Sequence, residues 1–415
     1  MKVFLAPNTA NIYDLTQLKE LANGLRLRGH EAYVFECPIK QHHSDYRLTE
    51  FQRAGYSEKK VYQEINSEIL IEVNRFRSRH LKKSTRHVSW FQDVRPSDYV
   101  KLAKYSSQMR PGDLIYLLGD KKHFGFSSAF ERIECLLSGT SLQKINSKPI
   151  MTKDFKYDVN LLGYFSTLKE RPPLPFIRSR ANILLKEIMR RPKSLAEILF
   201  ARNAHINLDH LFYDKLFVKH EELIKAKYEP LTGYLFEPEL KEIKNNIDQA
   251  IYDYLYIEIP RKLDRSLLFA RIQALHFRDK QVIIAGLNWP EGFPSAPFVR
   301  GHIDRPEEIY QSSKITIHNN THGLGIHSRV LDCMAVGGFV MMHPSPHSRL
   351  PGGMDSTFEP DVNYGLYSAD NFVEKVEEWL ADEDRRNKAI TENKKILLSK
   401  HLWEHRAEQI LRDLR

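Results

Sequence analysis

The chain has 415 residues, of which 42% are hydrophobic and 28% charged, so its composition is that of a globular protein and excludes a disordered or fibrous chain. Its net charge of +9 indicates anionic partners such as nucleotide phosphates or an acidic membrane face, with a merely basic surface as the alternative. The basic residues are scattered and match no nucleic-acid-binding module, so we expect no nucleic-acid partner.

The cysteines and the hydropathy pattern bear on the compartment. Cys37, Cys135 and Cys333 lack the spacing of a metal site and are odd in number, which favours a reducing environment. The first residues contain no signal-peptide core, and no apolar run reaches the length of about 18 residues that a membrane span needs. We therefore expect a cytoplasmic protein without a membrane span.

The first part of the chain alternates strand and helix patterns. Strands are predicted over residues 2–6, 31–36, 87–91 and 113–119. Helices are predicted over residues 15–25, closed by Gly29, and over a long charged stretch, 58–83. This order is typical of a doubly wound parallel sheet, and we assign residues 1–145 to one α/β domain.

The second part resumes this pattern after an interruption. YDVNLLGYF (157–165) predicts the first strand of a second α/β domain, assigned to residues 150–177 and 259–398. Residues 178–258 lack β-like runs and predict an all-helical insertion. Further strands are predicted over residues 281–286, 314–320 and 339–342. Helices are predicted over residues 265–275, 327–338, 370–381 and 402–414.

Residues 319–339 (NNTHGLGIHSRVLDCMAVGGF) form the densest candidate site, because a loop with two glycines leads from a strand into a helix. Free N–H groups at a helix start suit a phosphate, and His322, His327 and Arg329 add further donors. Arg329 can grip a diphosphate with two hydrogen bonds, and Asp332 can accept ribose hydroxyls. The alternative is an ordinary glycine loop with a structural Arg329–Asp332 pair. Neither GxGxxG nor GxxxxGK[ST] occurs, which argues against a dehydrogenase or a kinase.

Several segments resemble a known family. VIIAGLNW, FVRGHIDRPEEIYQSSKITIHNN and SRVLDCMAVGGFVMM, within residues 281–342, resemble the donor domain of spore-maturation-protein-like glycosyltransferases. The tail, FVEKVEEWLADEDRRNKAI and HLWEHRAEQIL, has the pattern that closes such domains, and RGHEAYVFE with VSWFQD resembles their acceptor domain. The resemblance implies a GT-B architecture, in which two Rossmann-like domains face a cleft. It also implies that residues 399–415 form a helix returning to the first domain.

The resemblance implies a reaction as well. A sugar would pass from a nucleoside diphosphate, the co-substrate, to an acceptor hydroxyl on a glycan, a lipid-linked glycan or a protein. No cofactor and no metal are expected, because positive side chains and helix dipoles act on the departing diphosphate. By position, Asp332 matches the acid placed against the ribose and Arg329 the preceding basic residue. Many related retaining enzymes carry Glu where this chain has Leu324, and PNTAN replaces a glycine-rich loop. The donor sugar and the anomeric outcome therefore stay open, and a degenerate binding protein or a nucleotide-sugar epimerase remains an alternative.

The expected donor site collects residues that follow strand ends. These are Gly163, Gly286, Trp289, His322, Gly323, His327, Arg329 and Asp332. Trp289 is expected to stack on the base or line the pocket, unless it is a packed core residue. His327 also counts among the catalytic candidates, because it can stabilise charge on the leaving diphosphate.

An inverting reaction needs a general base in the first domain. Asp93 is the first candidate because it follows the strand predicted over 87–91, at the edge where ligands bind in open sheets, and His123 is the second. A helix cap or a salt bridge is the alternative for Asp93. Asn8, Asn11 and Asp93 are the expected acceptor contacts, with ordinary turn residues as the alternative for both asparagines.

The helical insertion has no catalytic assignment. It can dock an acceptor, a lipid face or a partner subunit, and peripheral contact with an anionic membrane face stays open, as does the oligomeric state. His205, His210 and His220 within it are interpreted as surface or core histidines and not as a metal site.

Overall fold

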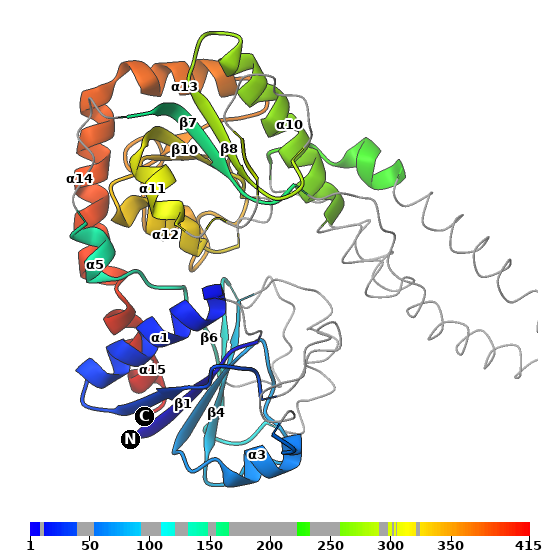
Figure 1. Ribbon diagram of the computed structural model, residues 1–415, viewed down its shortest axis with the longest axis vertical. Coiled ribbons are helices and arrows are strands. Elements are labelled where there is room, and N and C mark those ends of the chain that lie inside the picture. The colour runs from blue at the N-terminus through cyan, green and yellow to red at the C-terminus, as the bar shows by residue number, and fades with distance from the viewer. Residues whose placement is uncertain are drawn as a thin grey trace, which may run out of the picture.

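A computed structural model describes residues 1–8, 12–39, 54–92, 109–120, 132–147, 155–165, 222–232, 258–289, 298–300, 303, 305–320 and 324–415. Two parallel β-sheets with helices on their faces make up two domains, the N-terminal one below the C-terminal one in Figure 1. The expected architecture of two Rossmann-like domains is therefore confirmed. No helix in these ranges is long and apolar enough to cross a membrane.

The N-terminal sheet has six parallel strands in the order β2-β1-β3-β4-β5-β6. Its strands are β1 (Lys2–Ala6), β2 (Glu31–Val34), β3 (Ile69–Val73), β4 (Arg86–Phe91), β5 (Leu114–Leu117) and β6 (Ile133–Cys135). Its helices are α1 (Ile12–Leu27) and α3 (Glu58–Glu64), and the short α5 (Leu142–Ile145) follows the sheet. The fully buried strands explain the continuous apolar runs in the sequence.

The prediction of one long helix over residues 58–83 is wrong. Only Glu58–Glu64 is helical, and Ile69–Val73 forms β3 between β1 and β4. Every residue of β3 is buried, including Glu72. Because Glu72 and the residues on either side of this strand are charged, the sequence pattern resembles that of a solvent-exposed helix.

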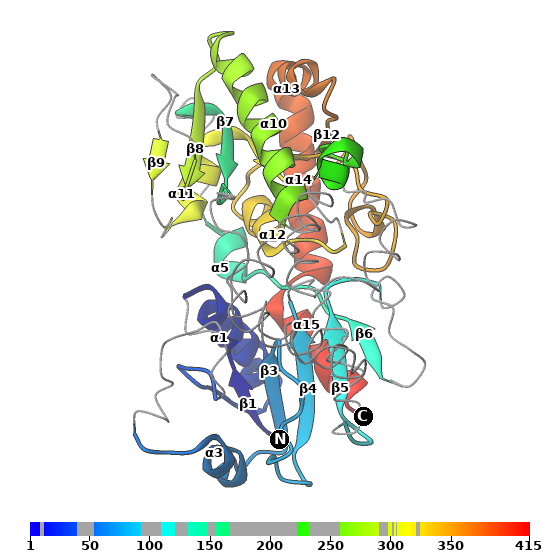
Figure 2. The same cartoon turned by 90° about the vertical axis from the view of Figure 1, so that its right-hand side faces the viewer.

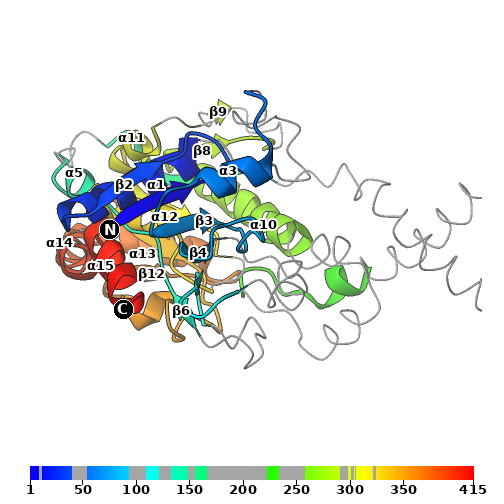
Figure 3. The same ribbon diagram turned by 90° about the horizontal axis from the view of Figure 1, so that it is seen from below.

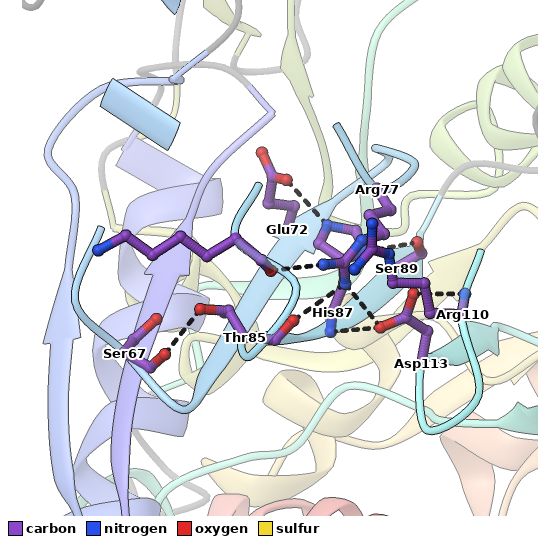
Figure 4. A network of polar contacts seen from close by, with 9 residues as sticks. Ser67, Glu72, Arg77, Thr85, His87, Ser89, Arg110 and Asp113 are labelled. Atoms are coloured by element: carbon purple, nitrogen blue, oxygen red, sulfur yellow. Dashed lines mark hydrogen bonds and ion pairs between the residues drawn. The ribbon is translucent and has the colours of Figure 1, made fainter. Parts of the chain in front are cut away.

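Glu72 is satisfied by a buried polar network on one face of the sheet (Figure 4). Its carboxylate accepts a hydrogen bond from the Tyr62 hydroxyl at 2.8 Å and lies 2.8 Å from His87 Nε2. His87 Nδ1 lies 3.2 Å from the Ser89 hydroxyl. Since all four side chains are buried, the network is structural and offers no surface to a substrate.

The C-terminal sheet also has six parallel strands, in the order β12-β11-β10-β7-β8-β9. Its strands are β7 (Tyr157–Leu162), β8 (Val282–Gly286), β9 (Phe298–Arg300), β10 (Ser313–His318), β11 (Val340–Met342) and β12 (Gly365–Leu366). Its helices are α10 (Ile259–His276), α11 (Pro306–Gln311), α12 (Ser328–Ala335), the 3₁₀ turn η4 (Met354–Ser356), α13 (Phe372–Ala381) and α14 (Glu383–Lys400). When these strands are renumbered from one along the chain, their order in the sheet is 6-5-4-1-2-3, the same as in a dinucleotide-binding Rossmann domain.

The chain ends with one helix more than predicted. Between α13 and α15 (Trp403–Asp413), the 18-residue α14 runs along the C-terminal domain toward the N-terminal one (Figure 2). Its buried stripe consists of Arg386, Ala389, Asn393 and Leu397. Because half of this stripe is polar, the helical periodicity of apolar residues that reveals an amphipathic helix is weak here.

Helix α15 packs in the N-terminal domain, beside α1 (Figure 3). Trp403 joins the core between α1 and the sheet, with its ring 6.1 Å from that of Trp90. The Arg28–Glu408 ion pair at 3.0 Å and a 3.0 Å hydrogen bond from the Tyr116 hydroxyl to Asp413 add polar contacts. Both chain termini therefore lie in the N-terminal domain.

The junction between α14 and α15 predicts acid sensitivity. His401 is 3% exposed, and its Nδ1 lies 2.7 Å from Arg406 Nη2, which can only donate, so the imidazole is neutral. Burial and then Arg406 lower the pKa of His401 to about 3. A folded-state pKa below the unfolded value makes stability complete above about pH 6.5 and lowers it as the pH falls toward 3.

We expect this one group to cost about 2 kcal/mol of unfolding free energy between pH 7 and pH 5. His401→Gln keeps an acceptor for Arg406 and removes the titration. Urea unfolding at both pH values should show a smaller pH dependence for His401→Gln than for the wild type. An identical pH dependence in the two proteins would contradict this role.

Candidate functional site

The C-terminal sheet reverses its strand order between β7 and β10. From β7 the chain builds outward through β8 and β9, then returns to the other side of β7 for β10, β11 and β12. In open α/β sheets, ligands bind at the carboxyl ends of the strands at such a reversal. Gly163 directly follows β7, and His318 ends β10.

Two guanidinium groups lie over Gly163. A β-carbon placed on Gly163 would lie 3.3 Å from Arg265 Nη2 and 3.7 Å from Arg329 Nη1. Arg261 is one helical turn before Arg265 on α10, so it projects from the same side. We call Arg261, Arg265 and Arg329 the arginine cluster. Neither the Arg265 nor the Arg329 guanidinium has a hydrogen bond or an ion pair within the part of the chain that the structure describes, whereas Arg261 contacts Glu258 at 3.3 Å.

The arginine cluster is electrostatically unfavourable on its own. Burial, and then the charges of Arg261 and Arg329, lower the pKa of Arg265 to about 9. Like charges whose repulsion nearby carboxylates offset only in part are stabilised further when an anion binds between them. A small pocket beside the cluster is lined by Leu162, Tyr310, Thr316, Ile317, His318, Arg329, Val330 and Val340.

His327 begins α12 and adds a neutral donor. Its Nδ1 accepts a hydrogen bond from the Arg329 backbone N–H at 3.1 Å, so the imidazole proton belongs on Nε2. Desolvation, and then the charges of Arg329, Arg261 and Arg265, lower the pKa of His327. The first turn of α12 therefore offers a hydrogen-bond donor beside the guanidinium groups. The expected role of His327 at a diphosphate stays a prediction.

Asp332 forms an ion pair with Lys144 and not with Arg329, the structural partner considered in the sequence analysis. Its carboxylate lies 2.8 Å from Lys144 Nζ on α5, and Lys144 also contacts Glu307 at 3.1 Å. Asp332 thus does not pair with Arg329, which leaves the Arg329 guanidinium free to bind an anion. The ribose contact expected of Asp332 stays a prediction, and its carboxylate already carries an ion pair.

Trp289 is a core residue. Its ring is 7% exposed and packs against Phe165 and Phe269, so little of its surface can stack on a base. Its Nε1 donates a hydrogen bond to the Gly163 carbonyl at 2.9 Å. Trp289 therefore holds the glycine beneath the arginine cluster, as the core alternative expects, and a contact with the base stays a prediction.

Replacing Gly286, at the end of β8, should have a large effect on the free energy of unfolding. It has a φ of +134°, and a β-carbon there would lie 1.7 Å from the Gly163 carbonyl oxygen. We expect Gly286→Ala to lose about 2 kcal/mol or more of unfolding free energy, because backbone must move. Gly55 is the matched control, with φ of +79° and no atom within 4 Å of its β-carbon position. Urea unfolding should show a loss of only about 1 kcal/mol for Gly55→Ala, and equal losses would refute the close approach.

Five predicted site residues lie outside the described residues: Asn11, Asp93, His123, His322 and Gly323. The three histidines of the insertion lie outside them too, as does most of residues 178–258. Asn8, two residues beyond β1, is described, and its buried side-chain oxygen has no hydrogen-bond partner in the described part of the chain. The general base and the acceptor contacts stay predictions.

Leu324 belongs to the contact between the domains. Its side chain packs with Phe91, Leu117 and neighbouring apolar residues of the N-terminal sheet. The backbones meet closely there, because β-carbons on Gly119 and Gly325 would lie 2.4 Å and 1.8 Å from carbonyl oxygens of the opposite domain. Leu324, at the position where many related retaining enzymes carry Glu, therefore serves interdomain packing in this chain.

Arg261 and Arg265 are the functional candidates that the sequence analysis missed. They stand four residues apart in RKLDR, at the start of the helix that follows β7 in the C-terminal domain. That helix is separated from β7 by about 95 residues of sequence, which hid its place at the strand end. Two arginines at positions i and i+4, one helical turn apart, were the available signal in the sequence.

The comparisons with known proteins agree with this geometry. Residues 261–412 match the family described as glycosyl transferase-like. Among solved structures, a glycosyltransferase from Rickettsia africae superposes with a TM-score of 0.50 at 11% identity, covering 100% of this chain and 97% of the other. Anabaena HepE in complex with UDP and glucose gives 0.51 at 9% identity, covering 99% and 98%. WaaG, a glycosyltransferase of lipopolysaccharide biosynthesis, gives 0.50 at 11% identity, covering 99% and 98%. No curated protein sequence matches the chain.

The chain has the GT-B fold, and residues 261–412 of its C-terminal domain match the glycosyl transferase-like family. The matching family is the broad glycosyl transferase-like one, and it covers less than half of the chain.

Proposed function

We propose that the chain transfers a glycosyl group from a nucleoside-diphosphate sugar to an acceptor hydroxyl, and that the arginine cluster holds the diphosphate. The observation that carries the proposal is the position of Arg265 and Arg329 over Gly163, at the strand reversal of a glycosyltransferase domain. Neither guanidinium has a counter-ion within the described ranges.

The charges suit the leaving group of this reaction. When the bond between the sugar and the diphosphate breaks, the nucleoside diphosphate gains a further negative charge. Fixed donors that face this developing charge stabilise the transition state more than the ground state. Arg261, Arg265 and Arg329 provide three positive charges, and His327 provides its Nε2–H as a donor at the start of α12. This set can do the work of a metal ion, so we propose a metal-independent reaction.

The resemblance to spore-maturation-protein-like enzymes suggests that this chain belongs to that subgroup, acts in the cytoplasm and uses a glycan, lipid-linked glycan or protein acceptor. Asp93 or His123 would serve as the general base of an inverting reaction. The Anabaena neighbour was solved with UDP and glucose, which makes UDP the first nucleotide to test.

A thermal-shift screen tests the donor class. A ligand that binds only the folded state raises the apparent melting temperature. We expect one of UDP, GDP, dTDP, CDP and ADP to raise it, and the matching nucleotide sugar to be turned over. Binding without hydrolysis or transfer would favour the degenerate binding protein, and interconversion of the sugar without an acceptor would favour the epimerase. A panel without any stabilising nucleotide would contradict the proposal.

A further inference from the structure

A fully buried carboxylate lies on α10 next to the arginine cluster. Asp264 is 0% exposed and directly precedes Arg265. One of its oxygens accepts hydrogen bonds from the Tyr228 hydroxyl at 2.9 Å and from the Leu231 backbone N–H at 2.8 Å. The other accepts a hydrogen bond from Asn319 Nδ2 at 3.1 Å. Within the described residues, Asp264 is therefore held by neutral donors and forms no ion pair.

The three donors come from two segments that are distant in the sequence. Asn319 directly follows β10 and begins the connection that leads to Arg329 on α12. Tyr228 and Leu231 belong to segment 222–232, which lies inside the predicted insertion. Asp264 thus joins the helix that carries two guanidinium groups, the connection that leads to the third, and the described piece of the insertion.

Segment 222–232 is docked firmly at this point. Leu231 is 1% exposed and packs in the hydrophobic core of the C-terminal domain with Leu268 and Ile317. Its φ of +65° is unfavourable for a residue with a side chain, so tertiary contacts must hold it. The hydrogen bond from its N–H to Asp264 is one such contact.

We propose that Asp264 is a positioning residue for the diphosphate site, and that anion binding to the arginine cluster is coupled to the docking of segment 222–232. The inference rests on the proposed function of the arginine cluster. Asp264 sets the rotation of α10, and thereby the direction of Arg261 and Arg265, against the strand end that leads to Arg329. Its negative charge also offsets part of the repulsion within the cluster, since Asp264 is among the groups that favour the charged form of Arg265.

Coupling of this kind is reciprocal. If docking of the segment favours anion binding, the anion must stabilise the docked segment by the same factor. A purely structural role for Asp264 would lower the stability of the domain without linking the two events. The two cases differ in the hydrogen exchange of the segment measured with and without an anion.

The test uses inorganic pyrophosphate as a probe that needs no nucleobase. We expect pyrophosphate to slow amide hydrogen exchange in residues 228–231 of the wild-type chain. Asp264→Asn places an N–H₂ group where an acceptor is needed. In this variant the dissociation constant of pyrophosphate should rise about tenfold, and pyrophosphate should no longer slow the hydrogen exchange of residues 228–231. Asp158→Asn is the matched control, because Asp158 contacts Lys314 at 2.7 Å and the Gln281 N–H at 2.9 Å at the amino ends of the strands, opposite to the arginine cluster. The control should bind pyrophosphate like the wild type.

Tyr228→Phe provides a second, milder variant that removes only one hydrogen bond, in case Asp264→Asn does not fold. We expect a two- to fivefold weaker affinity, at the low end of allosteric couplings, and faster exchange of the segment. Unchanged pyrophosphate affinity and unchanged protection in these variants would overturn the coupling while leaving the proposed function intact. A wild-type chain that binds neither pyrophosphate nor any nucleotide would overturn the proposed function itself.

Discussion

Replacing Arg329 with Ala should reduce the turnover of the nucleotide sugar, or its affinity, at least tenfold, because a charge-assisted contact to the diphosphate is lost. The fold should persist, since the Arg329 side chain has no hydrogen bond or ion pair among the described residues, and its backbone N–H remains in Ala. Its guanidinium lies over Gly163, so the loss acts at the site itself. Steady-state kinetics with the donor chosen by the nucleotide screen measure the effect.

Arg278→Ala is the matched control for Arg329→Ala. Arg278 lies just beyond the carboxyl end of α10, where it pairs with Glu377 at 2.9 Å and is 56% exposed. An exposed pair contributes little to stability, and this one lies away from the arginine cluster. Its removal should leave kinetics unchanged. Wild-type activity in Arg329→Ala, or an equal loss in both variants, would refute the assignment.

Asp113→Ala should lower the unfolding free energy by about 3–5 kcal/mol, because it leaves a buried guanidinium without its counter-ion. Arg77 and Asp113 form a 2.9 Å ion pair in which both side chains are 2% exposed (Figure 4). The same carboxylate accepts hydrogen bonds from the backbone N–H groups of His87 at 2.8 Å and Arg110 at 2.9 Å. Asp113 therefore joins the start of β4 to the turn before β5.

Urea unfolding of a double-mutant cycle checks this prediction. Adding Arg77→Met to Asp113→Ala removes the orphaned charge, so the double variant should be more stable than Asp113→Ala alone. Glu378→Ala is the surface control, since its contacts with Lys375 at 2.7 Å and Arg385 at 2.9 Å join partly exposed side chains and should together contribute about 1 kcal/mol or less. An Asp113→Ala variant as stable as this control would contradict the buried pair.

The sequence predicted most of the sheet strands because parallel strands buried on both faces are short apolar runs between turns. β7, β8 and β10 follow this rule. The sequence did not predict β3 and α14, because Glu72, Arg386 and Asn393 place polar groups at buried positions. A buried polar residue is stable only with partners that are distant in the sequence, such as His87 for Glu72, and a single sequence does not show those partners.

The site was predicted in part for the same reason. A strand–glycine loop–helix pattern is local, so it located His327 and Arg329 at the start of α12. The position of Arg265 beside Arg329, the Lys144 partner of Asp332, and the core packing of Trp289 are tertiary contacts. Residue types alone suggested that Asp332 contacts the ribose and that Trp289 stacks on the nucleotide base. In the fold, both side chains have partners within the protein.

The most direct test is a crystal structure of the chain with the nucleoside diphosphate selected by the thermal-shift screen. We predict the diphosphate above Gly163, with its oxygens about 3 Å from the guanidinium groups of Arg265 and Arg329. A nucleotide bound elsewhere, with both guanidinium groups still without an anion, would contradict the assignment of the arginine cluster as the donor site.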